Sequence, residues 1–214
     1  IEVISTITTF EFISIRCGQD FDSYHEYFKL ILESIQTQCP VYSINIPEHY
    51  LGDDMVHVIS NFILRFPLIT DLDISDNCFT AHGIRLICIA ASQIPTFNSL
   101  NISSNTLTGA LGYAVTYSIP MLTELHCSDC ELTDDDMWAI VELIRRGLLE
   151  LFMDSNNFTD QAYARLYGEL TTNPPLTVLF MSPHSMTSSV NVAEVIKTNT
   201  VLKKLHLDGD RYRN

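Results

Sequence analysis

The sequence predicts an α/β solenoid in which one strand–turn–helix unit is repeated along the chain. Two observations predict it: a pair of apolar strand residues recurs every 25 to 28 residues, and a polar position follows each pair at a nearly constant distance. A recurring period of about 20 to 50 residues is typical of repeat architectures, in which each unit packs only against its neighbours. We therefore expect a single domain over residues 1–214, with about seven repeats in 41–212 and a divergent capping repeat in 1–40.

The clearest repeat is the stretch Ile69–Gly83, which reads ITDLDISDNCFTAHG. It follows the pattern L-x-x-L-x-L-x-x-N/C-x-L, the signature of a leucine-rich repeat. The first core position of each strand is occupied by Ile44, Leu72, Leu100, Leu125, Leu151, Leu179 and Leu205. The second, two residues later, is occupied by Ile46, Ile74, Ile102, Cys127, Met153, Met181 and Leu207. Because strand side chains alternate with period two, both residues of a pair should point into the core.

Two further positions keep the same register. The polar ladder position is occupied by His49, Asn77, Asn105, Cys130, Asn156, His184 and Asp210. We expect the asparagines to bridge backbone groups of neighbouring repeats. The apolar position two residues later is occupied by Leu51, Phe79, Leu107, Leu132, Phe158, Met186 and Tyr212.

A threonine then opens a helical segment in most repeats, where its hydroxyl can act as an N-cap. The threonines are Thr80, Thr108, Thr133, Thr159 and Thr187, and Gly52 departs from the pattern. The expected helices are Gly83–Ala91, Leu111–Tyr117, Met137–Ile144, Ala162–Leu170 and Val190–Ile196. Prolines that cannot continue a helix end five units, at Pro40, Pro67, Pro95, Pro120 and Pro174–Pro175. Acidic residues after a cap, such as those of 134–136, are expected to complement a helix dipole.

Residues 1–40 are the least regular part of the chain. The β-branched and aromatic alternation of Thr8–Ile15 predicts a strand. The apolar spacing over Asp20–Gln38 predicts an amphipathic helix, with Asp20 or Asp22 as its N-cap. We interpret this unit as a first repeat that covers the open end of the core.

The long period and the true helices resemble the ribonuclease-inhibitor-like class of leucine-rich repeats. That class includes ribonuclease inhibitor, the Ran GTPase-activating protein, tropomodulin, CARMIL proteins and the sensor arrays of NOD-like receptors. The resemblance implies a horseshoe arc, with the parallel sheet on the concave side and the helices on the convex side. It also implies an intracellular protein-recognition scaffold.

The charge and the cysteine content of the chain limit the classes of partner and the location that we expect. The chain carries 26 acidic against 12 basic residues, a formal charge of −14, which argues against nucleic acid and anionic membranes and suits a protein partner with a basic surface. A soluble acidic protein with no charge-driven partner is the alternative. No apolar run is long enough for a membrane span. The six cysteines mostly occupy core or ladder positions, which indicates reduced thiols and a cytoplasmic location. Cys127 and Cys130 are accounted for in this way rather than as a redox or metal pair.

The candidate site is the outward face of the strands, which folding does not require to be apolar. Its central column is Asn45, Asp73, Asn101, His126, Phe152, Phe180 and His206. The column one residue before the first core position is Ser43, Asp71, Ser99, Glu124, Glu150, Val178 and Lys204. The column one residue after the second is Pro47, Ser75, Ser103, Ser128, Asp154, Ser182 and Asp208.

Adjacent strands lie about 5 Å apart, so Phe152 and Phe180 should lie side by side, flanked by His126 and His206. Exposed aromatics with a charged rim are typical of a binding hot spot. The rim is an acidic border of Glu124, Glu150 and Asp154, and a second acidic patch toward the N-terminal end consists of Asp71, Asp73 and Asp76. The alternative is that another segment of the parent protein covers the rings. The predicted partner-binding residues are Asp71, Asp73, Asn101, Glu124, His126, Glu150, Phe152, Asp154, Phe180 and His206.

These observations favour a non-catalytic protein–protein interaction scaffold, the repeat domain of a larger signalling or cytoskeletal regulator. No nucleophile, base and orienting group assemble from the columns, and we expect no enzymatic activity, cofactor or metal. A GTPase-activating regulator resembling the Ran GTPase-activating protein is the alternative, although the loops after the strands carry Asp76, Ser104, Asp129 and Ser155 and no arginine. Because no helix follows the last predicted strand, we expect additional domains of the same parent chain.

Overall fold

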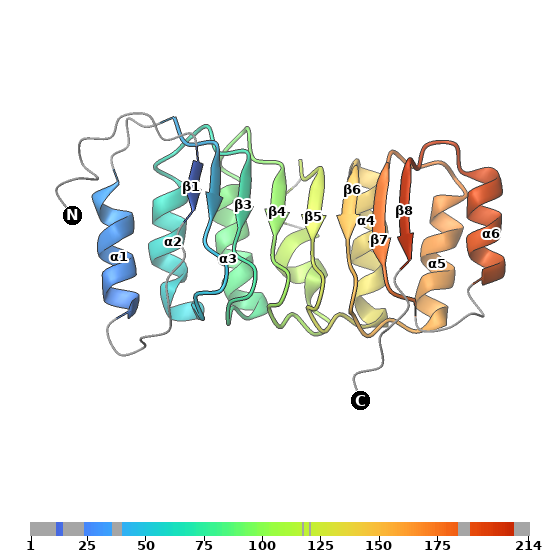
Figure 1. The fold of residues 1–214 in the computed structure, drawn as a ribbon, viewed down its shortest axis with the longest axis horizontal. Helices are drawn as coiled ribbons and strands as arrows, with labels where there is room; N and C mark the ends of the chain where they lie inside the picture. Colours follow the sequence, from blue (N-terminus) through green and yellow to red (C-terminus); the bar gives the residue numbers. More distant parts are fainter. Residues whose placement is uncertain are drawn as a thin grey trace.

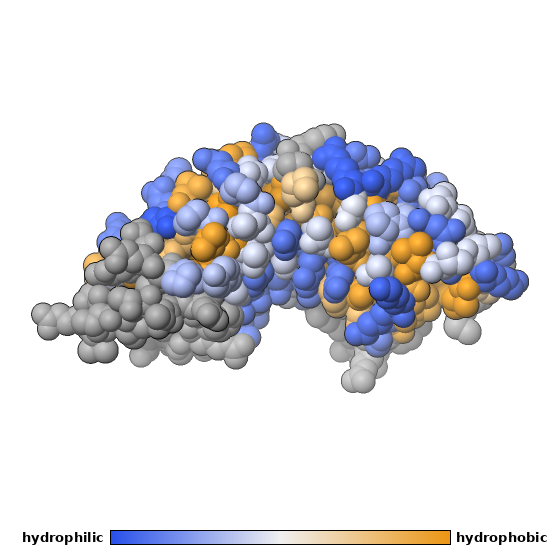
Figure 2. Space-filling model, turned by 90° about the horizontal axis from the view of Figure 1, so that it is seen from above, coloured by the Kyte–Doolittle hydropathy of each residue, from blue (hydrophilic) through white to orange (hydrophobic). Residues whose placement is uncertain are grey.

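The chain forms an α/β leucine-rich repeat solenoid. The computed structural model describes residues 12–14, 24–35, 40–116, 118–119, 121–183 and 189–207. Eight parallel strands form one sheet whose spatial order follows the chain, and Figure 1 shows them side by side with the central helices behind them. Seen from above in Figure 2, the molecule is an arc hollowed on one side. The sheet lines that concave side, and the helices lie on the convex side, as predicted.

Each strand is short and aligns with its neighbours at equivalent repeat positions. The strands are β1 (Phe12–Ser14), β2 (Ser43–Asn45), β3 (Asp71–Asp73), β4 (Ser99–Asn101), β5 (Glu124–His126), β6 (Glu150–Phe152), β7 (Val178–Met181) and β8 (Lys204–Leu207). Ile13 pairs with Ile44, so the predicted first repeat joins the sheet in register. Leu72 pairs with Leu100, and Leu125 with Leu151, which confirms the predicted alignment.

The helices agree with the prediction in most repeats. They are α1 (Tyr24–Ser34), α2 (Val56–Ile63), α3 (Ala81–Ala91), α4 (Met137–Arg146), α5 (Asp160–Leu170) and α6 (Ser189–Thr198). The hydroxyls of Thr80 and Thr159 accept the predicted N-cap hydrogen bonds, from the N–H of His82 and of Gln161. Several predicted positions lie outside the described residues, namely Asp20, Asp22, Pro120, His184, Met186, Thr187, Asp208, Asp210 and Tyr212.

Two repeats differ from the expectation. The segment after Gly52 does form a helix, α2, preceded by the 3-10 turn η2 (Asp53–Met55), although no threonine cap signals it. The predicted helix Leu111–Tyr117 is instead the π-helical segment η3 (Gly112–Thr116). The indole of Trp138 packs against the backbone of Gly112 so closely that an added Cβ would lie 2.2 Å from its Cζ2. This close approach accompanies the shortest repeat of the array.

The asparagine ladder forms as predicted. The side-chain oxygen of Asn77 accepts from the N–H groups of His49 and Leu51, at 3.1 and 3.0 Å, and its amide donates to the carbonyls of Ile46 and Ile74 at 3.0 Å. Asn105 and Asn156 bridge repeats in the same way. These bonds satisfy buried backbone groups that the short strands leave without ladder partners.

Cys130 replaces asparagine by a different arrangement. Its thiol donates to the carbonyl of Ile102 at 3.2 Å, and its own backbone carbonyl accepts from the N–H of Leu107. Glu131, the next residue, has a left-handed φ of 56°, and Tyr50 after His49 has one of 52°. Among the ladder residues that the structure describes, His49 and Cys130 are the two that are not asparagine, and each is followed by a residue with a left-handed φ.

Buried thiols give a prediction about reactivity. Desolvation raises the pKa of Cys130 to about 12 and raises the pKa values of Cys88 and Cys127 as well, whereas Cys78 is exposed. The thiolate is the reactive form, and a raised pKa keeps it scarce at pH 8. In a thiol titration of the folded protein, Cys78→Ser should remove one fast-reacting equivalent and Cys130→Ser none. A loss of fast equivalents in Cys130→Ser would show that the ladder thiol is open to solvent.

Candidate functional site

The strands present the three outward columns on the concave side. In β2 to β6 only the central residue is buried, so its two neighbours point away from the core. Successive side chains of a strand point to opposite faces, and the in-register pairing brings equivalent residues of adjacent repeats together. The concave face is thus set by the same register that builds the core.

Four rings of the central column form a continuous stack across β5 to β8. His126 and Phe152 lie 4.0 Å apart between ring centroids, with an interplanar angle of 7°. Phe152 and Phe180 lie 4.8 Å apart at 25°, and Phe180 and His206 also lie 4.8 Å apart at 25°. We name these four residues the ring stack. The prediction that the two phenylalanines lie side by side between the two histidines is confirmed.

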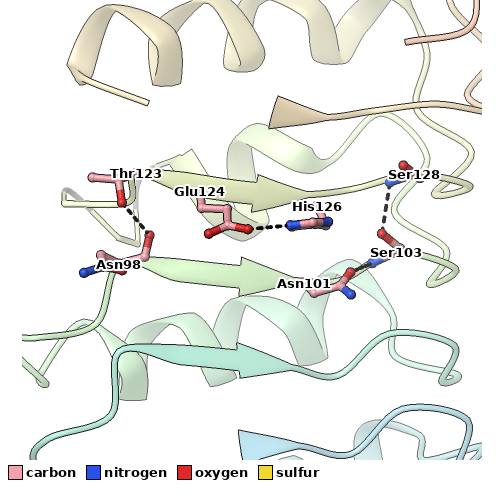
Figure 3. A network of polar contacts seen from close by, with 7 residues as sticks. All are labelled: Asn98, Asn101, Ser103, Thr123, Glu124, His126 and Ser128. Carbon is pink, nitrogen blue, oxygen red and sulfur yellow. Dashed lines mark hydrogen bonds and ion pairs between the residues drawn. The ribbon is translucent and has the colours of Figure 1, made fainter. Parts of the chain in front are cut away.

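The acidic border (Glu124, Glu150 and Asp154) lies beside the ring stack. Glu124 and Glu150 occupy paired positions of β5 and β6, so two like charges are neighbours. Glu124 also contacts the Nε2 of His126 at 2.8 Å, as Figure 3 shows along β5. Asp154 lies 3.5 Å from the hydroxyl of Ser182 on the neighbouring repeat. The border is therefore tied to the stack at His126 and to the adjacent repeat at Ser182, which follows β7.

A basic residue that the sequence reasoning did not select completes the site. The Nζ of Lys204 lies 4.6 Å from the ring centroid of Phe180, a cation–π contact. Lys204 pairs with Val178 in the sheet, in the same column as Glu124 and Glu150. Its position in that column was the available signal, because it is a basic residue where the other charged members are acidic.

The second acidic patch does not join the ring stack. Asp71 and Asp73 lie on β3, and β4 separates them from β5. Asp73 is engaged locally, accepting from the N–H and the hydroxyl of Ser75 at 2.9 and 2.6 Å. Asn101 on β4 likewise accepts from the N–H of Ser103 at 3.0 Å, which is drawn in Figure 3. Asp73 and Asn101 thus support the turns that follow their strands, whereas Asp71, at the start of β3, accepts from the hydroxyl of Thr70 at 2.7 Å. Asn101 pairs with His126 in the sheet, so it borders the first ring of the stack.

Three other kinds of feature matter in the part of the chain that the structure describes: metal sites, membrane-spanning helices and reactive cysteine pairs. Among them, no three histidine, cysteine or acidic side chains gather in a way that could hold a metal ion. No helix in the described ranges has the length and apolar character needed to cross a membrane. Cys127 and Cys130 are both free, buried thiols at the predicted core and ladder positions.

Comparisons with known proteins give distant structural likenesses. No protein-family model matches the chain, and no curated protein matches its sequence. One similar solved structure is leiomodin-1 actin-binding site 2, with a TM-score of 0.44 and 14% identity over 86% of this chain and 91% of that one. Another is the internalin InlF of Listeria monocytogenes, with a TM-score of 0.48 and 12% identity over 84% of this chain. This chain spans 44% of the length of the internalin structure.

Proposed function

We propose that this chain is a non-catalytic protein–protein interaction scaffold of the ribonuclease-inhibitor-like class, which binds a cytoplasmic protein partner on its concave face. The ring stack carries this proposal. Its four rings lie on the face that the core does not use, at centroid distances of 4.0 to 4.8 Å. Clustered aromatic residues with a charged rim are the usual composition of a binding hot spot.

The rings of the stack are preorganised in the unbound protein. Each ring is held by its neighbours, and His126 is additionally held by Glu124 at 2.8 Å. Binding a preformed surface costs little side-chain entropy, which increases the affinity gained from each contact. Rim charges such as Glu150 and Asp154 would then act mainly on the association rate and its salt dependence.

Truncating the two central rings should weaken partner binding. We expect Phe152→Ala and Phe180→Ala each to reduce affinity by about 1 kcal/mol or more, which is roughly fivefold in Kd. The folded state should persist, because neither side chain belongs to the core. The measurement is a pulldown from cell extract with the wild type and the double variant in parallel, followed by titration of the captured protein.

A matched control uses exposed apolar residues of the convex side. Ile89 on α3 and Ile196 on α6 are 41% and 67% exposed, so an Ile89→Ala/Ile196→Ala double variant removes comparable apolar surface from the helices. A partner kept by this control and lost by the ring variant supports concave-face binding. Equal retention by all three proteins would contradict it and would direct attention to the helices or the ends.

A further inference from the structure

The ring stack exposes only one part of its inner rings. Phe152 has His126 on one side and Phe180 on the other, and Phe180 lies between Phe152 and His206. Because their faces are covered, these two rings present their edges to the concave space. Nucleobases and quaternary ammonium groups bind an open aromatic face. Such ligands therefore do not suit the centre of the stack.

Ring edges favour other groups. The edge of an aromatic ring carries the positive part of its quadrupole, and it packs well against another aromatic face or an alkyl chain. Aliphatic and aromatic side chains of a peptide supply these groups. The centre of the stack is accordingly suited to an apolar peptide segment.

The charge beside the stack changes sign along the sheet. Glu124 on β5 and Glu150 on β6 are acidic, Val178 on β7 is neutral, and Lys204 on β8 is basic. Within the described part of the three outward columns, Lys204 is the single lysine or arginine. A ligand that lies across the four strands thus meets carboxylates at one end of the ring stack and an ammonium group at the other.

We infer that the ring stack binds a bipolar peptide segment of its partner: apolar in the centre, basic over Glu124 and Glu150, and acidic at Lys204. This inference rests on the proposed concave-face binding and adds the chemistry of the partner. The stack crosses three strand intervals of about 4.8 Å each, a length that about five extended residues cover. Opposite charges at the two ends fix the direction in which such a segment lies.

The test uses three acetylated and amidated octapeptides with the same Leu-Phe-Leu-Phe centre. One carries Arg-Lys at one end and Glu-Glu at the other, the second carries Arg-Lys at both ends, and the third carries Glu-Glu at both. The basic end of the bipolar peptide can be either its N-terminal or its C-terminal end, because the peptide can lie on the sheet in either chain direction. The comparison therefore depends on the charges of the ends and not on the order of the sequence. Binding is followed by fluorescence anisotropy of a labelled peptide at 150 mM salt.

The decisive variant is Lys204→Glu, with Lys197→Glu as the control. Lys197 is an exposed residue of α6 in the same terminal part of the array, so both variants change the net charge equally but on opposite sides. The quantity compared is the ratio of the affinity for the bipolar peptide to the affinity for the peptide with basic residues at both ends. We expect Lys204→Glu to lower this ratio by about threefold or more. Lys197→Glu should leave this ratio unchanged. A protein with a formal charge of −14 attracts basic peptides in general. Because both variants change the net charge equally, any effect of this general attraction on the ratio is the same in both, and the difference between them reports the position of the charge.

An unchanged ratio in Lys204→Glu, or no binding of any peptide, overturns the inference. Failure of the proposed function has a different signature. If Phe152→Ala/Phe180→Ala leaves both the peptides and the captured cellular partner bound, the concave face is not the binding site at all. If that double variant loses the cellular partner but the peptide ratio does not respond to Lys204→Glu, the scaffold function stands and the bipolar segment is wrong.

Discussion

Replacing Asp136 by alanine is expected to lower the free energy of unfolding by about 4 kcal/mol. Asp136 is 1% exposed, and its carboxylate accepts three backbone N–H groups. Two belong to the preceding repeat, Gly109 at 2.9 Å and Leu111 at 2.8 Å, and the third belongs to Thr133 at 2.9 Å. Alanine would leave these donors without their charged acceptor in or near the core, where an unmade hydrogen bond costs more than it does in water.

The adjacent carboxylate provides the control for this prediction. Asp135 belongs to the same acidic run but is exposed, and Asp135→Ala should change stability by no more than about 0.5 kcal/mol. Urea titrations followed by far-UV circular dichroism would give both values from the shift of the midpoint. Equal midpoints for the two variants would contradict the role of Asp136 as a clamp between repeats. Asp136→Asn keeps the shape and one oxygen acceptor, so its midpoint should lie between those of the wild type and the alanine variant.

The role of Asp136 also shows where inference from the sequence stopped. The acidic run at 134–136 was predicted to complement a helix dipole, and Thr133 with Asp136 does form a capping box. The sequence did not indicate that Asp136 reaches back to Gly109 and Leu111, in effect capping η3 of the previous repeat. Nor did it indicate that Asp134 accepts from the N–H of Thr159 in the next repeat, at 2.8 Å. Repeat alignment identifies equivalent residues, whereas these bonds join non-equivalent positions of neighbouring turns.

The ring stack could be predicted because its members occupy equivalent positions of neighbouring repeats. Phe152 and Phe180 occupy the same repeat position, and an in-register parallel sheet places equivalent residues in contact. His126 and His206 followed from the same column. Lys204 was in the adjacent column, but its approach to the Phe180 ring depends on a long, flexible side chain whose direction the period does not fix. The separation of Asp71 and Asp73 from the stack also follows from the sequence, because the strand order places β4 between β3 and β5. Their hydrogen bonds to Thr70 and Ser75 are what the columns do not specify.

The backbone between the strands was the least predictable part. The left-handed φ values at Tyr50 and Glu131 fall on residues that carry a Cβ and have no glycine signal. They follow the ladder residues His49 and Cys130. At Cys130 the backbone carbonyl accepts from the N–H of Leu107, whereas the equivalent N–H groups of Leu51 and Leu132 are bound by an asparagine side chain. In η3 the π-helical segment begins at Gly112, against which Trp138 of the following repeat packs closely. At Cys130 and at Gly112 the unexpected local conformation accompanies a contact with a neighbouring repeat.

Replacing Asn156 by alanine is expected to be about as damaging as removing Asp136, at roughly 3 to 5 kcal/mol. Asn156 is 2% exposed, and its side-chain oxygen accepts from the N–H groups of Cys130 and Leu132, both at 3.0 Å. Its amide donates to the carbonyls of Cys127 and Met153, at 2.8 and 3.0 Å. One side chain thus satisfies backbone groups of two repeats, and alanine satisfies none of them.

Asn157 offers the matched control, since it is the same residue type at the next position and is exposed. Asn157→Ala should change the free energy of unfolding by about 0.5 kcal/mol or less, and a similar loss in both variants would refute the ladder explanation. Asn156→Cys tests the mechanism further, because Cys130 occupies a ladder position with the help of a left-handed residue at Glu131. At Asn156 the following residue does not have that conformation, so cysteine alone should recover only part of the loss. Adding Asn157→Gly, which permits a left-handed φ at the next position, should recover more. That dependence would show that the ladder side chain and the backbone after it act as alternative sources of the same acceptor.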